Sequence, residues 1–458
     1  MRIADALLLL SLPFEGLVFF GTIMGWPSLA EVLKQVSVYE DLCDLNSNAT
    51  VVTNGIVNCN ERDIIFSTAG TIGGFSMNCM ALLFGYILDK KGLLISRVLM
   101  TITVTSGLLC LMFTPQVNWL MFPGIFLNSA GGYGFVLTNG TMATLFPYFA
   151  AIVLVIVQSI FQMSSSFFRI QAMIFNSGVS YQWIVAINIL LTIPVWIRTL
   201  FLFPEGHFIY KNDIFPSTFF GKRLLCRSNK IDDSEKIAPD PDQELLESTE
   251  GLSFYFKDAT YLVMVLWITT ASIFTLCCLF TWNAYARMVA GDNYQKHVDN
   301  FGSIAWTPAA FGLVCGPISD LLTKFFKNKS PDFGKILGVL MFVVVDLIVG
   351  IILCAFQVTF KEENLLPIIY FYNMYRAFHS SVPAIFVKFL FPPQFFGSLV
   401  GFVRFSLGIT SLFMLGLPEI PKEYGESGFK GIFYFHIASQ VALIFFPIML
   451  IKKLKEMQ

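Results

Sequence analysis

Long apolar runs separated by short polar turns dominate the hydrophobic pattern of the chain. A helix needs about 20 apolar residues to cross about 30 Å of hydrocarbon, and twelve segments approach this length. They lie near residues 5–25, 64–88, 93–113, 119–140, 147–174, 180–203, 259–282, 301–323, 334–356, 366–390, 397–417 and 431–451. The pattern therefore predicts an all-α polytopic membrane protein with twelve transmembrane helices.

One long polar segment, residues 204–256, divides these runs six and six and is rich in Asp, Glu, Lys, Ser and Pro. A segment of low hydrophobicity and high charge cannot bury a core, so we interpret it as a solvated cytoplasmic linker. This predicts an N-terminal six-helix half at residues 1–203, a linker at 204–256 and a C-terminal six-helix half at 257–458.

Basic residues define the topology. Twelve spans place both termini on one side of the membrane, and the loops on that side are rich in Lys and Arg, which the positive-inside rule makes cytoplasmic. We expect a multi-pass protein of the plasma membrane with both termini in the cytoplasm. The basic positions are Lys90, Lys91, Arg97, Lys222, Arg223, Arg227, Lys230, Lys324, Lys327, Lys329, Lys452, Lys453 and Lys455.

The first loop, residues 27–62, faces the opposite side and is acidic. It contains Asn48-Ala49-Thr50, an acceptor sequence for N-glycosylation. It also contains Cys43 and Cys59, which can form a disulfide if the loop faces an oxidising compartment. We expect glycosylation at Asn48 and pairing of Cys43 with Cys59.

The composition limits the classes of function that the chain can have. The chain is 55% hydrophobic and 13% charged, with a mean hydropathy of +0.68, which is typical of a chain solvated by lipid. A net charge of −1 provides no basic field for nucleic acid. No hydrolase, P-loop, zinc or dinucleotide motif stands in a supporting context. We therefore expect a monomeric membrane protein that is not an enzyme and has no cofactor, metal site or nucleic-acid partner.

Ionisable residues inside spans need an explanation, because each costs about 2.5–3.5 kcal/mol on insertion scales. Glu15 lies near the middle of the first span, and Arg376 lies ten residues into the tenth. The two form either a structural ion pair or a site that hydrogen-bonds a polar solute. We favour the site, since a cavity keeps both charges hydrated.

His379 follows Arg376 by three residues and shares its helical face. It contacts a planar solute, titrates as a proton sensor or makes an interhelical hydrogen bond. Asp346 in the ninth span is interpreted as an interhelical partner, with proton coupling as the alternative. Four basic residues lie nearer span ends and are expected to snorkel to the surface: Arg169, Arg198, Lys388 and Arg404.

Small and hydroxyl residues gather at 128–134 and at Thr138-Asn139 in the fourth span, and at 164–166 in the fifth. Such residues either let helices pack closely or line a polar path. Asn139 and Ser165 are thus candidates for solute contact, and helix packing remains the alternative.

A short charged turn, Gly85-Tyr86-Ile87-Leu88-Asp89-Lys90-Lys91-Gly92, joins the second and third spans. Gly92 can adopt a left-handed backbone there and Gly85 admits a close helix. Asp89 is placed to accept hydrogen bonds from a helix N-terminus, while Lys90 stays hydrated. The turn recurs as Gly316-Pro317-Ile318-Ser319-Asp320, about half the chain later, which indicates a duplicated bundle.

The turn at 85–92 resembles the signature loop of the major facilitator superfamily. Within it, further pieces are similar to solute carrier family 43, which comprises sodium-independent facilitators of large neutral amino acids and an equilibrative nucleobase transporter. Gly25-Trp26-Pro27-Ser28-Leu29 and the Pro-x-Gly-His after the sixth span resemble the nucleobase branch more closely. The remaining pieces are Asp41-Leu42-Cys43, Arg198-Thr199-Leu200-Phe201-Leu202-Phe203 and Phe391-Pro392-Pro393-Gln394-Phe395-Phe396-Gly397.

The resemblance implies a major facilitator fold of two six-helix halves and a rocker-switch carrier. Its cavity is expected between spans one, four, seven and ten, with a cytoplasmic latch formed by Gly85, Asp89, Lys90 and Gly92 and echoed by Asp320. Leu93 stands where family members usually have arginine, which implies a weaker latch.

The leading hypothesis is facilitative, sodium-independent and equilibrative transport of purine nucleobases. Arg376, Asn139 and His379 would hydrogen-bond ring edges, and Tyr375 and Trp267 would stack on the ring. Transport of large neutral amino acids is the alternative, in which Glu15 and Arg376 hold the two ends of a zwitterion. A non-transporting receptor or scaffold on the same fold is the third hypothesis.

Overall fold

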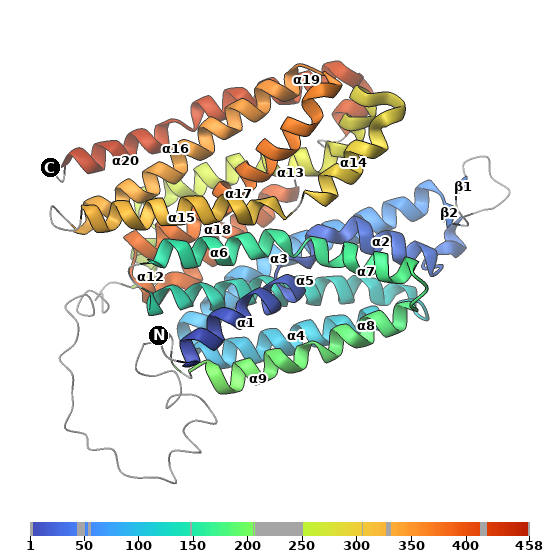
Figure 1. Cartoon of the computed structure of the whole chain (residues 1–458), viewed down its shortest axis with the longest axis horizontal. Helices are drawn as coiled ribbons and strands as arrows, with labels where there is room; N and C mark the ends of the chain where they lie inside the picture. The colour runs from blue at the N-terminus through green and yellow to red at the C-terminus, as the bar shows by residue number, and fades with distance from the viewer. Residues whose placement is uncertain are drawn as a thin grey trace, which may run out of the picture. The chain divides into compact units, whose positions relative to one another are not determined.

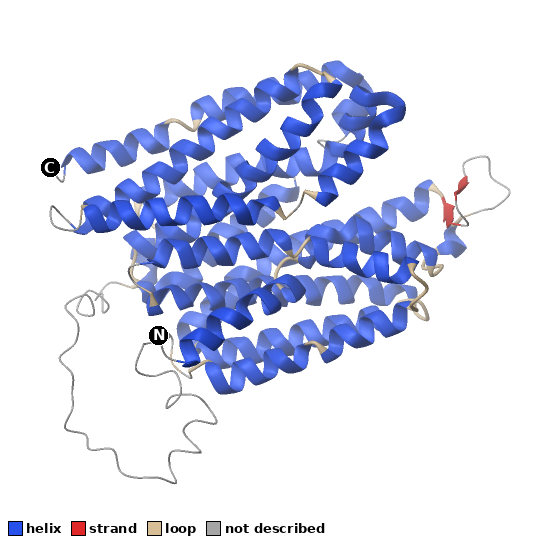
Figure 2. Ribbon diagram, viewed as in Figure 1, coloured by secondary structure: helices blue, strands red, loops and turns tan. Residues whose placement is uncertain are grey.

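The computed structural model describes residues 3–43, 51–53, 56–146, 149–204, 206, 251–304, 306–326, 331–412 and 419–456. The predicted glycosylation site Asn48 and most of the predicted linker, residues 205 and 207–250, lie outside these residues. Helices make up nearly all of the described chain (Figure 2). The exception is an antiparallel hairpin of β1 (Val51–Thr53) and β2 (Ile56–Asn58). The predicted all-α class is confirmed.

Helices occupy all twelve predicted positions. Eight of those in the described residues are long and apolar enough to cross a membrane, or nine if the bent pair at the N-terminus is one span. The other three predicted spans coincide with α15 (Thr307–Phe325), α17 (Leu365–Leu390) and α18 (Phe396–Ser411). In α17 the polar residues discussed below interrupt the apolar run, and the described part of α18 has 16 residues.

Residue contacts divide the chain into two compact units. The first unit comprises residues 1–139 and 163–229, and the second comprises 140–162 and 230–458. The predicted domain boundaries on either side of the linker stay a prediction.

The helices of the first unit are seen in blue to green in Figure 1. They are α1 (Ile3–Phe19), α2 (Trp26–Gln35), α3 (Asn60–Lys91), α4 (Leu93–Met112), α5 (Met121–Gly140), α7 (Ser166–Asn176), α8 (Tyr181–Leu190) and α9 (Thr192–Leu202), with 3₁₀ turns at Thr22–Gly25, Glu40–Leu42 and Asn118–Leu120.

The helical segment at the first predicted span continues past residue 25 and is bent. It runs through α1, a 3₁₀ turn and α2, with a bend of 48° at the break. The backbone N–H of Gly21, freed by the break, donates to Ser164 Oγ at 2.8 Å. The break therefore has a side-chain partner from the fifth span, as a non-helical backbone inside a membrane requires.

A disulfide joins Cys43 to Cys59, as predicted. Next to it, the guanidinium of Arg62 is fully buried and donates to the Val38 and Lys34 carbonyls at 2.9 and 2.8 Å. Lys34 lies in the last turn of α2 and Val38 follows the helix. Carbonyl groups at a helix C-terminus lack the N–H donors of a next turn. The disulfide and Arg62 together fasten the loop after α2 to the start of α3.

Replacing Cys43 with Ser should lower the stability of the purified protein. The bond closes a loop with a sequence separation of 16, and such a loop is worth about 3 kcal/mol in the chain-entropy description. Thermal unfolding in detergent measures the loss. Cys110→Ser, at a half-buried free cysteine of α4, is the control. Equal unfolding temperatures for the two variants would contradict the expectation.

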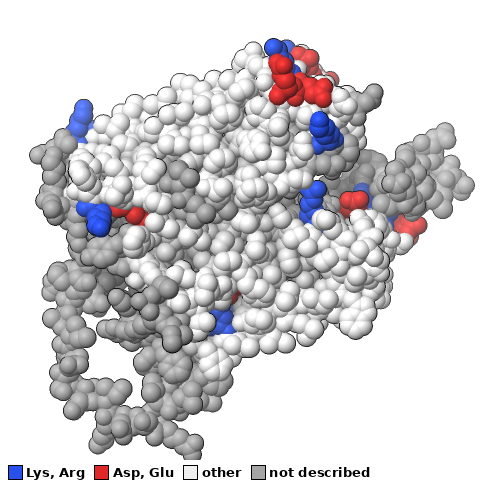
Figure 3. Space-filling view, in the orientation of Figure 1, with Lys and Arg blue, Asp and Glu red and all other residues white. Residues whose placement is uncertain are grey.

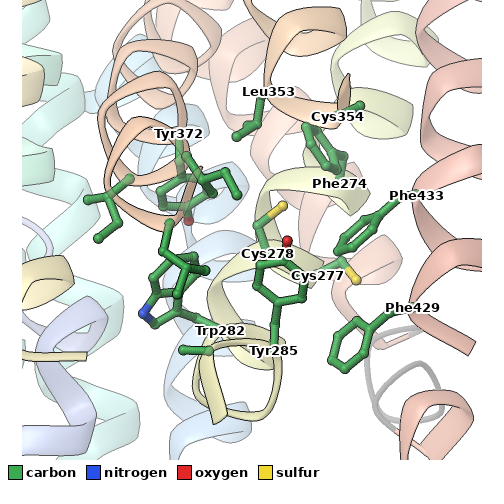
Figure 4. Packing of buried hydrophobic residues seen from close by; sticks show 14 of the residues in the cluster. Phe274, Cys277, Cys278, Trp282, Tyr285, Leu353, Cys354, Tyr372, Phe429 and Phe433 are labelled. Carbon is green, nitrogen blue, oxygen red and sulfur yellow. The ribbon is translucent and has the colours of Figure 1, made fainter. Parts of the chain in front are cut away.

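The second unit is also helical. It contains α6 (Ala150–Met163), α12 (Leu252–Tyr255), α13 (Ala259–Ala290), α14 (Tyr294–Ser303), α15, α16 (Pro331–Val358), α17, α18, α19 (Glu419–Ala442) and α20 (Phe445–Glu456), with 3₁₀ turns at Thr141–Leu145, Gly291–Asn293, Glu362–Asn364 and Pro393–Phe395. Its core joins α13, α16, α17 and α19 through aromatic rings and thiols, among them Trp282, Tyr285, Tyr372 and Phe433 (Figure 4).

Exposed apolar side chains cover much of the outer surface. Leu10 and Phe325 are each 76% exposed, and Trp183 is 69% exposed. On the face drawn in Figure 3, uncharged side chains form a broad area with few Lys, Arg, Asp or Glu atoms. A surface of this kind is matched to lipid rather than to water.

Candidate substrate site

Glu15 is the centre of a buried charged cluster in the first unit. Its Oε2 accepts from Arg97 of α4 at 2.5 Å and lies 2.7 Å from Arg198 Nη1 of α9. Its Oε1 accepts from Asn139 Nδ2 at 2.7 Å. Glu15 and Arg97 are completely buried and Arg198 is 4% exposed. Two cations thus enclose one carboxylate.

The remaining donors of this Glu15 cluster are also used. Arg97 donates to Thr138 and Thr199, and Arg198 donates to Ser11, the Leu8 carbonyl and Asn139 Oδ1. The prediction that Arg198 snorkels to the surface is wrong, and Arg97, expected with the cytoplasmic lysines, is buried as well. Ion pairing across α1, α4 and α9 replaces the hydration that these charges would have in water.

The hydroxyl-rich stretch of the fifth span packs closely on the first. Ser164 accepts from Gly21, and the Ser165 carbonyl oxygen lies where a side chain on Gly25 would have to sit. Ser165 itself is half-buried. For this stretch the structure supplies the packing alternative, and solute contact by Ser165 stays a prediction.

His379 is the centre of a second polar cluster, in the second unit. Its Nε2 lies 2.6 Å from Ser272 Oγ of α13, and its Nδ1 lies 3.5 Å from Asp346 Oδ2 of α16. The interhelical partner expected for Asp346 is therefore His379. Asp346 is fully buried and makes no hydrogen bond of normal geometry in the described residues.

Two fully buried aromatic residues flank His379. Tyr375 stacks on the imidazole, with ring centroids 5.4 Å apart and planes 11° apart. The ring centroids of Trp267 and His379 are 5.8 Å apart. The Tyr375 hydroxyl accepts from Gln440 Nε2 at 3.0 Å. The predicted residues His379, Tyr375 and Trp267 are thus brought together, and the two rings position the imidazole.

The side chain of Arg376 contacts α6, unlike that of His379. Its Nη2 donates to Gln162 Oε1 of α6, and its guanidinium lies 5.5 Å from the ring centroid of Tyr372. The side chain is 5% exposed, and within the described residues it contacts no carboxylate. A buried cation compensated only by an amide and a ring is a natural binding group for an electron-rich solute.

Comparison with known proteins identifies the family. The profile of the Major Facilitator Superfamily matches residues 16–415. The chain belongs to the Major Facilitator Superfamily. This confirms the resemblance seen in the signature loop.

Two relatives come from the branches that the resemblance named. Equilibrative nucleobase transporter 1 of Bos taurus is 25% identical over 433 residues, covering 88% of this chain and 87% of the relative. Large neutral amino acids transporter small subunit 3 of Homo sapiens is 23% identical over 174 residues, covering 36% of this chain and 31% of the relative. This major facilitator chain is therefore a multi-pass membrane protein whose relatives are transporters.

Solved structures agree on the fold. A bacterial homologue of the iron transporter ferroportin, in an outward-facing state, superposes with a TM-score of 0.61 at 12% identity and covers 99% of this chain and 100% of that one. The proton:xylose symporter XylE gives a TM-score of 0.62 at 13% identity, with 97% and 94% coverage. At these identities the likeness shows the major facilitator fold alone.

The major facilitator signature turn has the predicted backbone. Gly92 separates α3 from α4 with φ of +83°, and its N–H donates to the Leu88 carbonyl at 3.0 Å. Lys90 is exposed, Gly85 is buried and Asp89 is half-buried in the last turn of α3. Because glycine lacks a Cβ, it tolerates the positive φ that this connection needs.

Asp320 of α15 caps another helix. Its two carboxylate oxygens accept from the backbone N–H groups of Ala151 and Ile152 at 3.0 and 2.9 Å. These groups belong to the first turn of α6, where N–H donors lack helical partners and the helix dipole favours an anion. Asp320 thus fastens α15 to the start of α6, which also carries Gln162.

Asp320→Ala should destabilise this contact by about 0.5–2 kcal/mol, the usual cost of losing an N-terminal cap. Asp320→Asn retains one acceptor oxygen and should lose less. Thermal unfolding of the purified variants gives the order. Glu363→Ala, at an exposed carboxylate, is the control. If Ala and Asn variants unfold like the control, the cap has no energetic role.

Sequence reasoning does not predict Arg97, Arg198 or Gln162 as members of these sites. Arg97 and Arg198 lie within a turn or two of span ends, a position that predicts a side chain at the membrane surface. Gln162 is uncharged, so the cost of burying a charge does not point to it. A signal was present, since Gln158 and Gln162 are amides four residues apart on one face of an apolar helix.

Proposed function

We propose that this protein is a facilitative transporter of purine nucleobases that works without sodium, by rocker-switch alternating access, in the plasma membrane. It equilibrates its substrate and has no catalytic activity. The basic positions named above, apart from the buried Arg97, support termini in the cytoplasm. A polar planar solute meets the donors of Arg376 during its passage.

The observation that carries this proposal is the double pairing of Glu15. A zwitterionic amino acid needs an anionic host for its ammonium group as well as a cationic host for its carboxylate. Glu15, the candidate for the anionic host, already contacts Arg97 and Arg198. An ammonium group that bound Glu15 would have to displace one of these two guanidinium groups.

Among the described residues, each of the other two buried carboxylates also lies against a protein group. Asp320 caps α6 and Asp346 faces His379. In the described part of the chain, these two and Glu15 are the acidic residues that are buried. Arg376, in contrast, has no carboxylate partner there. This balance favours a neutral, acceptor-bearing substrate over a zwitterion, in agreement with the relative that matches over most of the chain.

Transport of large neutral amino acids is the second candidate, because relatives of that name match about a third of the chain. Purified full-length protein in liposomes separates the two. We expect saturable uptake of radiolabelled hypoxanthine or adenine, unchanged by sodium and ending at equal concentrations, with no saturable leucine uptake. Saturable leucine uptake without uptake of either purine would overturn the proposal.

A further inference from the structure

We propose that Arg376 makes this transporter selective for 6-oxopurines, such as hypoxanthine and guanine, over the 6-aminopurine adenine. The inference rests on the proposed function and names the substrate class of that site. It depends on how many donors Arg376 has left and on which acceptor already uses one of them.

The guanidinium of arginine carries five N–H donors in a planar fork and no acceptor. The structure gives Arg376 one hydrogen bond, from Nη2 to Gln162 Oε1, and one ring contact, with Tyr372. Four donors are thus left without a protein acceptor among the described residues. A ligand that satisfies them must present acceptors.

Gln162 fixes the fork. It comes from α6, whereas Arg376 comes from α17, so the hydrogen bond holds the guanidinium between two helices. The Tyr372 ring, one turn earlier on α17, lies near the guanidinium and is part of the aromatic core in Figure 4. A fork held in this way keeps its remaining donors in one fixed plane, which favours recognition of a planar edge.

The two purine classes differ at that edge. A 6-oxopurine presents two neighbouring acceptors, O6 and N7, which a guanidinium fork can bind together. Adenine presents the acceptor N7 beside an N6 amino donor, and it suits an amide such as Gln or Asn instead. Arg376 therefore pairs with both groups of hypoxanthine but opposes the amino group of adenine.

The test compares kcat/KM for hypoxanthine and adenine in proteoliposomes of the full-length protein, two bases that differ at this edge. We expect the wild type to prefer hypoxanthine by about 5–150-fold, the range for one good bidentate pair. Arg376→Gln should reverse or abolish the preference, because an amide matches adenine. Arg404→Gln is the matched control, since Arg404 of α18 donates to Gln158 one turn earlier on α6; its ratio should stay that of the wild type.

Gln162→Glu provides a second test that keeps Arg376 in place. The new carboxylate would pair with the guanidinium and withdraw its donors, so the hypoxanthine-to-adenine ratio should fall toward one. A wild-type ratio near one, or ratios that neither Arg376→Gln nor Gln162→Glu changes, would overturn the selectivity. Leucine uptake without purine uptake would instead refute the proposed function.

Discussion

Glu15→Gln should destabilise the first unit by about 3–5 kcal/mol, the usual cost of removing one partner from a buried ion pair. The substitution keeps the size of the side chain but leaves Arg97 and Arg198 facing each other without the anion that both contact. Neither guanidinium can reach water, because Arg97 is fully buried and Arg198 is 4% exposed. Thermal unfolding in detergent, followed by size-exclusion chromatography, measures the loss.

A second substitution separates charge from shape. Glu15→Gln combined with Arg198→Gln removes one cation together with the carboxylate, so the double variant should be more stable than Glu15→Gln alone. Glu31→Gln, at an exposed carboxylate of α2, serves as the control and should unfold like the wild type. Additive losses in the double variant would show that the cluster is held by packing rather than by charge.

The helices of this fold were predictable because the membrane sets their length. Each apolar run had to be long enough to cross the hydrocarbon, and helices occupy all twelve positions. The turn at Gly92 and the Cys43–Cys59 bond were also predictable, since each depends on residues close in the chain. The bend after Phe19 was missed, because the apolar run continues through it.

The partners of the buried charges were harder to predict. The position of a residue within its own span does not say which helix lies opposite, and Glu15 meets residues 82 and 183 positions later in the chain. Arg97 and Arg198 lie close enough to their span ends for snorkelling to be the cheaper expectation. Only the tertiary arrangement, which brings Glu15 of α1 to Arg97 of α4 and Arg198 of α9, replaces that route with an ion pair.

The sequence alone likewise could not decide whether Arg376 belongs to a structural ion pair or to a site that binds a solute. An arginine in an apolar span gives the same sequence pattern in both cases. The structure distinguishes them, because the uncharged Gln162 accepts from Arg376 where a structural ion pair would have a carboxylate. That arrangement stabilises the geometry of the guanidinium without neutralising it.

Arg376→Ala should lower kcat/KM for purine uptake by thirtyfold or more, while the protein remains folded. Truncating a buried, charged hydrogen-bonding group at a binding site typically removes about 2–5 kcal/mol, and here it removes every donor of the fork. The same substitution should destabilise the fold less than Glu15→Gln does, because it leaves no carboxylate unpaired. Among the described residues, only Gln162 loses a hydrogen bond. Uptake in proteoliposomes and thermal unfolding of the same preparation measure both quantities.

Arg376→Lys makes the reason for the loss testable. Lysine keeps the positive charge but has no planar fork, so it should recover only part of the purine uptake lost in Arg376→Ala. Gln162→Ala keeps the fork but removes its anchor on α6, and should raise KM more than it lowers kcat. If Arg376→Ala unfolds as readily as Glu15→Gln, the residue is structural, and its place as the purine-binding group would have to be given up.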